Sequence, residues 1–145
     1  MAKSRIKYRA LKKHWKYQLG EDFVLLVGIY PKKQIKTPYI KLTKGGKLTV
    51  KKTYAWDGPS GPMRDDETNM RSSLVHDALY QLMRMGELGQ EWKIPADELF
   101  HDMCINDGMK PRRARRAYKA LLAFGAGASK KQGGDKVKWK LAPPK

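Results

Sequence analysis

The stretch SSLVHDALYQLM, residues 72–83, has the helical period that decides how the second half of the chain folds. Apolar residues recur in it at intervals of three and four, which is typical of a helix that buries one stripe. The pattern predicts a helix over residues 70–86 that is capped near Thr68 or Asn69 and stops around Gly86. The predicted stripe is Arg71, Leu74, Val75, Ala78, Leu79 and Leu82.

Two more helices are predicted downstream of this one. The first covers residues 95–106, with Pro95 in its first turn, and the second covers residues 111–124 and ends at Gly125. The connection GELGQEWK between the first two helices is short, so these helices are expected to pack antiparallel.

Residues 19–56 carry the patterns of strands. FVLLVGIY at 23–30 is apolar throughout, and PYIKLTK is predicted to pair with KLTVKKTYAW across a turn at Gly45-Gly46. In KLTVKK, Leu48 and Val50 alternate with polar residues, which is typical of a half-buried antiparallel strand. The expected fold is α+β: a small antiparallel sheet, then an antiparallel helical pair and a third, basic helix.

The length of 145 residues predicts one domain. We place this α+β domain at residues 19–125, with a loop rich in Gly, Pro and Asp at 57–69. Residues 1–18 are predicted as a basic N-terminal arm, and residues 126–145 as a basic flexible tail.

The charge of the chain predicts a polyanionic partner. The sequence has 31 Lys and Arg against 14 Asp and Glu, a formal net charge of +17. Such a surplus favours nucleic acid, anionic membrane lipid or an acidic protein, and composition does not separate these partners. The third helix carries a basic face for such contacts: Arg112, Arg113, Arg115, Arg116 and Lys119.

Other classes are excluded by what the sequence lacks. Cys104 is the only cysteine, which excludes an internal disulfide and a cysteine-ligated zinc site. The basic N-terminus is not followed by the apolar segment of a signal peptide, and FVLLVGIY is too short to span a bilayer. We therefore expect a protein made soluble in a cytoplasm.

A catalytic site is predicted from helical geometry. At about 100° per residue, His76 lies at the border of its apolar stripe, with Tyr80 one turn further along. Asp97 lies at the corresponding border of the next helix. Antiparallel packing then brings His76 and Asp97 together at a half-buried rim, where the carboxylate orients the imidazole and the free ring nitrogen deprotonates water. Tyr80 is expected to hydrogen-bond the same carboxylate.

Asp77 points away from this pair and is available as a metal ligand. The loop WDGPSG at 56–61 is rich in glycine and can turn backbone carbonyls toward that carboxylate. Carbonyl oxygens with a carboxylate suit Ca²⁺, which polarises an ester carbonyl while His76 delivers the water.

Simpler alternatives stay open at this point. The His–Asp network can be a structural clasp, and Asp57 and Ser60 can form an Asx-type turn without any metal. A phosphohydrolase cluster is a third alternative, with the ligands His76, Asp77, Asp97 and His101.

The motifs resemble a family of small phage and prophage proteins of unknown function. The shared pattern is Asp-x-x-Ser-x-Pro, then His-Asp-x-x-Tyr, then Ala-Asp-x-x-Phe, over roughly residues 17–125. The matching residues are Asp57, Ser60, Pro62, His76, Asp77, Tyr80, Ala96, Asp97 and Phe100. The resemblance implies a phage setting, with the chain in the bacterial host cytoplasm or the virion and other virion proteins as partners.

The site is also similar to that of calcium-dependent phospholipases A2, especially the parvovirus capsid type. This resemblance implies that His76 is the base, that Tyr80 and Asp97 support it, and that calcium binds Asp77. The carbonyls of three loop residues complete the implied calcium site: Trp56, Gly58 and Ser60. Ser60 replaces a glycine of the viral loop, the disulfides of the secreted enzymes are absent, and the strand-rich first third has no counterpart.

Two functions are therefore expected. The first is a phage-encoded, calcium-dependent hydrolase of phospholipid-like esters that uses activated water. The second is a non-enzymatic virion or nucleic-acid-binding protein whose His–Asp network is structural.

Overall fold

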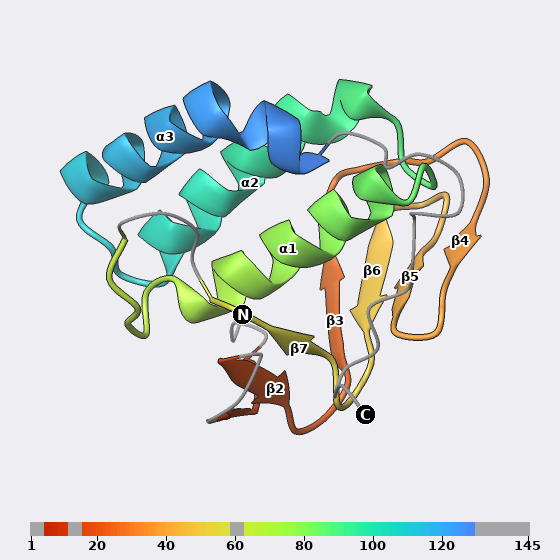
Figure 1. Cartoon of the computed structure of the whole chain (residues 1–145), viewed down its shortest axis with the longest axis horizontal. Helices are drawn as coiled ribbons and strands as arrows, with labels where there is room; N and C mark the ends of the chain where they lie inside the picture. Colours follow the sequence, from red (N-terminus) through yellow and green to blue (C-terminus); the bar gives the residue numbers. More distant parts are fainter. Residues whose placement is uncertain (1–4, 12–15, 59–62, 130–145) are drawn as a thin grey trace. The chain divides into compact units, whose positions relative to one another are not determined.

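The computed structural model describes residues 5–11, 16–58 and 63–129. The chain divides into two compact units between Asp57 and Gly58. The described strands belong to the first unit and the helices to the second, so the fold is α+β with the strands before the helices, as the sequence predicts (Figure 1).

The first unit contains a four-stranded antiparallel sheet in the order β3-β6-β5-β4. Its strands are β3 (Phe23–Leu26), β4 (Ile35–Lys36), β5 (Ile40–Leu42) and β6 (Lys47–Val50). The predicted hairpin across Gly45-Gly46 is confirmed: Leu42 pairs with Leu48, and Ile40 pairs with Val50. All four of these side chains are completely buried, because alternation along both strands turns them to the same face.

A smaller sheet forms from β1 (Tyr8–Ala10), β2 (Tyr17–Leu19) and β7 (Ala55–Trp56), in the order β1-β2-β7. Residues 8–10 and 17–18, predicted as parts of a basic arm, are therefore paired in a sheet. The aromatic rings of Tyr8, Tyr17 and Trp56 contact one another, which stabilises this pairing.

Two predicted strands are shorter than expected. FVLLVGIY stops being a strand after Leu26, because Gly28 takes a left-handed backbone conformation with φ 68°. KLTVKKTYAW is divided in two, since Thr53 has φ 76° and turns the chain out of β6. Its last two residues pair with β2 instead of continuing the hairpin.

The second unit contains α1 (Met70–Arg84), a short 3₁₀ turn η1 (Gln90–Trp92), α2 (Lys93–Asn106) and α3 (Pro111–Ser129). As predicted, α1 ends before Gly86, which has φ 76° and whose amide bonds the carbonyl of Met83. Gly125 does not end α3, which was wrongly predicted: its φ is not positive, and the helix continues through the following residues.

The helices pack with α2 between α1 and α3 (Figure 1). Successive hydrogen bonds join Arg71 to Asp107, Ser72 to Cys104 and His76 to Asp97, so α1 and α2 run antiparallel as predicted. Of the 15 residues of α1, 13 are buried, so the predicted single stripe was too narrow. None of the described helices is both long and apolar enough to cross a membrane.

Candidate active site

α1 and α2 bring His76 and Asp97 into direct contact. Nε2 of His76 lies 2.7 Å from Oδ1 of Asp97, which confirms the predicted contact. The expectation of a half-buried rim is wrong, because His76 is only 4% exposed and Asp97 is not exposed at all. The pair lies inside the protein because α1 is covered on nearly every side.

The carboxylate of Asp97 accepts hydrogen bonds from two further side chains. The hydroxyl of Tyr80 donates to Oδ1 over 2.6 Å, as predicted, and the ammonium of Lys93 donates to Oδ2 over 2.8 Å. Lys93 also donates to the backbone carbonyl of Leu121 in α3, over 3.2 Å. The network therefore connects all three helices.

Lys93 was missed by sequence reasoning. The predicted helix began at residue 95, whereas α2 begins at Lys93. Once the helix includes this residue, Lys93 and Asp97 are four residues apart and share a face, which is the spacing of a helical ion pair. The spacing of four residues between Lys93 and Asp97 can be read from the sequence. Because the predicted helix began at residue 95, Lys93 was not placed on the same helix as Asp97.

Asp97 is ionised, and this fixes the proton on His76. Burial raises the pKa of the Asp97 carboxyl, but the hydrogen bonds from its three donors outweigh burial and hold that pKa below its usual range. An ionised carboxylate only accepts hydrogen bonds, so Nε2 of His76 must donate. Burial also lowers the pKa of His76 by more than Asp97 raises it, so the ring is neutral near pH 7 and Nδ1 carries the free lone pair.

The imidazole is held in place by two aromatic rings. Its centroid lies 4.0 Å from that of Tyr80 and 5.4 Å from that of Phe100. No hydrogen-bond partner for Nδ1 is present among the described residues, whereas every fully buried side-chain nitrogen or oxygen there has one. Since Nε2 is engaged by Asp97, Nδ1 is the ring nitrogen that would have to accept a proton if His76 acted as a base.

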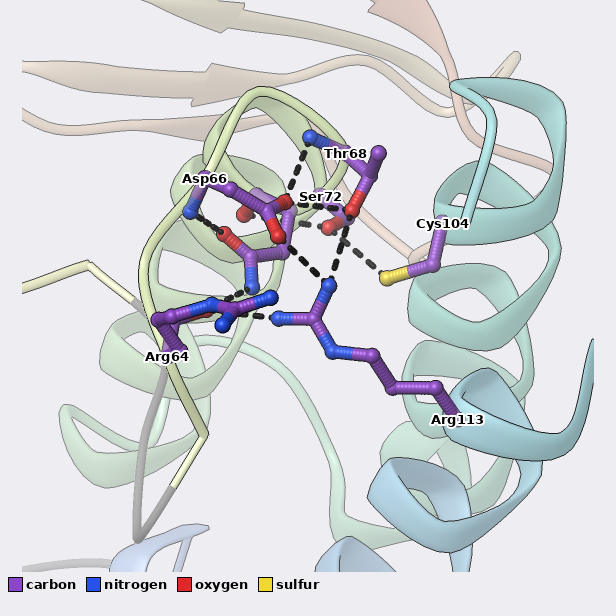
Figure 2. Close-up of polar contacts among 7 residues, drawn as sticks. Arg64, Asp66, Thr68, Ser72, Cys104 and Arg113 are labelled. Carbon is purple, nitrogen blue, oxygen red and sulfur yellow. Dashed lines mark hydrogen bonds and ion pairs between the residues drawn. The ribbon is translucent and has the colours of Figure 1, made fainter. Parts of the chain in front are cut away.

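No protein nucleophile is paired with this base in the part of the chain that the structure describes. His76 has no hydrogen bond there to a serine, threonine or cysteine. Ser72 lies one turn earlier on α1, but its hydroxyl bonds the carbonyl of Asn69 and the thiol of Cys104 (Figure 2). Burial raises the pKa of Cys104 to about 11, so its thiol stays protonated and unreactive. If His76 acted as a base, its reaction partner would therefore have to be a small molecule such as water.

The structure describes three of the four predicted calcium ligands. Asp77 is half-buried on α1, and Gly58 is buried with φ 79°. Trp56 belongs to the first unit, and Ser60 lies outside the described residues. Since no group of three His, Cys, Asp or Glu side chains suited to a metal occurs among residues 5–11, 16–58 and 63–129, calcium here would depend on Asp77 and backbone carbonyls.

The alternative phosphohydrolase cluster is not formed. His101, which would be its fourth ligand, hydrogen-bonds Asp102 through Nδ1 at 2.9 Å. Its ring also lies 5.6 Å from that of Tyr118 in α3. His101 therefore belongs to the α2–α3 surface and does not join His76 and Asp97.

Comparisons of the chain with protein-family models, curated proteins and solved structures find no match. The phage and phospholipase resemblances stay predictions from motifs.

Acidification is expected to destabilise the protein through His76. Because burial lowers its pKa in the folded state, the unfolded chain takes up the proton first, and stability falls as the pH drops below about 6.5. A further loss follows below about pH 3.8, since the pKa of Asp97 is also lowered in the folded state. Urea titrations across this range should show both losses.

The matched variants for this test are His76→Gln and His101→Gln. The first should remove most of the loss between about pH 7 and pH 5, and the second, at a partly exposed position, should leave it in place. An unchanged pH profile in His76→Gln would contradict the buried neutral imidazole.

Proposed function

We propose that this chain is a hydrolase in which His76 activates a water molecule to attack the ester carbonyl of a phospholipid-like substrate. The observation that supports it is the buried bond between Nε2 of His76 and Asp97, which leaves Nδ1 as the basic nitrogen. A neutral, oriented imidazole with a carboxylate behind it is the usual arrangement of a general base.

The proton moves in a closed cycle. Nδ1 of His76 takes a proton from water as the water oxygen bonds the carbonyl carbon, and the proton passes to the leaving alkoxide when the ester C–O bond breaks. The charge of Asp97 stabilises the imidazolium between these steps. Lys93 and Tyr80 keep that carboxylate ionised, so it orients the base without taking its proton.

The ester substrate and the calcium ion come from the phospholipase A2 resemblance. Asp77 follows His76 directly on α1, so a cation bound by its carboxylate would lie beside the same turn of helix. Asp77 would supply the carboxylate that holds calcium, and the ion would supply positive charge for the oxygen of the ester carbonyl.

The test is release of fatty acid from anionic phospholipid vesicles, with calcium and with a chelator. His76→Gln should reduce the rate by about 100-fold or more, the usual contribution of a general base. His101→Gln is the control and should keep the rate of the unchanged protein. Asp77→Asn should raise the calcium concentration needed for half-maximal activity.

Two results would reject the proposal. Unchanged fatty-acid release by a folded His76→Gln variant would exclude His76 as the base. Absence of release in every condition, together with a loss of stability in His76→Gln, would favour the structural clasp. The complete burial of Asp97 is the observation that favours this second candidate, a structural role for the His–Asp network.

A further inference from the structure

One face of α3 carries an unbroken row of cations. The α3 cation stripe consists of four exposed residues: Arg112, Arg115, Arg116 and Lys119. Their spacing of three, four and seven residues places them on the same side of the helix. α3 has no acidic residue, and within the described chain none of the four is in an ion pair. Their charges are therefore available to an external partner.

Arg113 was predicted with this group but has a different role. Figure 2 shows its guanidinium turned toward Asp66. The distance between Nη1 of Arg113 and Oδ2 of Asp66 is 2.5 Å. Nη2 donates to the backbone carbonyl of Arg64 over 2.7 Å. Asp66 also accepts the amide and hydroxyl of Thr68, so Arg113 fastens the segment before α1 to α3. It does not contribute to the stripe.

The opposite face of α3 is already occupied. Ala114 and Ala117 are buried in a cluster with Phe100, Cys104 and Met109, and Leu121 packs against it. A helix that lies in a membrane interface needs a free apolar face to insert among the lipid chains. Leu122, which is 38% exposed, does not by itself make such a face. The stripe is therefore suited to a polyanion that is contacted through charge alone.

Two exposed acids of α2, Glu98 and Asp102, interact electrostatically with Tyr118 of α3. Asp102 is hydrogen-bonded to His101, whose ring faces Tyr118. Tyr118 is about 100° around the helix from the middle of the stripe. Among the described residues, neither acid is in an ion pair with a residue of the stripe.

We propose that the α3 cation stripe binds the phosphate backbone of duplex nucleic acid without contacts to base edges. From Arg112 to Lys119 the helix rises about 10 Å, which matches about three phosphates of one strand at about 3.4 Å each along the duplex axis. The planar guanidinium of arginine also matches two phosphate oxygens at once. The net charge of +17 favours the approach of such a partner from a distance.

The experiment is titration of the full chain with a short mixed-sequence DNA duplex at several salt concentrations, followed by fluorescence anisotropy. The test variant is Arg112→Gln/Arg115→Gln/Arg116→Gln. It should weaken binding by about 10-fold or more and reduce the slope of log affinity against log salt by about 2 to 3, since each phosphate contact contributes about 0.9.

The matched control is Lys32→Gln/Lys33→Gln/Lys36→Gln, which removes three exposed charges from the first unit. It should keep the salt slope and nearly all of the affinity. Equal losses of duplex affinity in the two variants would show that only the net charge of the chain attracts the duplex. This result would overturn the proposal that the stripe is the binding site. A second control preserves the charge: Arg112→Lys/Arg115→Lys/Arg116→Lys. It should keep most of the binding, so weaker binding by the glutamine variant can be assigned to the lost charges and not to a disturbed fold.

A second arm uses vesicles of phosphatidylserine and phosphatidylcholine. Binding to vesicles that depends on the stripe, without binding to the duplex, would overturn the proposal in favour of a membrane surface. The outcome is independent of the hydrolase proposal, since His76→Gln should bind the duplex normally. Normal duplex binding by the test variant would also reject the stripe.

Discussion

Replacing Asp97 with alanine is expected to lower the free energy of unfolding by about 3–5 kcal/mol, the usual cost of removing one partner of a buried ion pair. The substitution leaves the ammonium of Lys93 without its carboxylate, and Lys93 is largely buried, with a side chain 13% exposed. It also leaves the donors of His76 and Tyr80 without an acceptor in a place that water hardly reaches. Urea unfolding followed by circular dichroism measures the change.

Asp102→Ala is the control for this experiment. Its carboxylate is 75% exposed on the same helix, so its removal should change stability by less than about 0.5 kcal/mol. Lys93→Met combined with Asp97→Leu should regain part of the loss, because the buried charges are removed together. A loss below about 1 kcal/mol in Asp97→Ala would contradict the buried network.

Asp107→Ala is expected to be destabilising by a similar amount, about 3–5 kcal/mol, for a different reason. Asp107 is the residue directly after α2 and accepts two parallel hydrogen bonds from the guanidinium of Arg71, each 3.0 Å long. The side chains are only 9% and 10% exposed. Because arginine cannot give up its proton, Arg71 would be left as an uncompensated buried charge at the start of α1. Chemical denaturation again gives the size of the effect.

The exposed pair of Lys51 and Asp22 supplies the comparison. Its side chains are 37% and 44% exposed, and Asp22 also accepts the backbone amide of Lys52. Lys51→Met should therefore change stability by less than about 1 kcal/mol. If Asp107→Ala lowered the free energy of unfolding no more than Lys51→Met does, the buried pair of Arg71 and Asp107 would not stabilise the fold more than an exposed pair.

The parts of the fold that the sequence predicts are those in which apolar residues recur at the regular spacing of a strand or a helix. Leu48 and Val50 alternate with polar residues and form the expected strand of the hairpin. The stretch at residues 72–83 forms the expected helix. The contact of His76 with Asp97 also follows from local rules, because a known helical angle and a short connection leave few ways for two neighbouring helices to face each other.

The parts that could not be predicted depend on distant segments. Pairing of β7 with β2 joins residues far apart in the chain, and nothing in the sequence near Trp56 indicates it. Arg113 has the same local pattern as its basic neighbours, and only the position of Asp66 separates it from them. Burial of α1 on nearly all sides likewise depends on tertiary packing and not on its own pattern.

The single thiol of the chain gives the helical unit an internal reporter. Cys104 has no exposed surface, and its sulfur is hydrogen-bonded to Ser72 of the neighbouring helix. A maleimide or disulfide reagent can reach it only after α1 or α3 moves away from α2, so the labelling rate measures how often this helical packing opens. No engineered probe is needed, and the same measurement on the Asp97 variants would show whether the network restrains breathing motions.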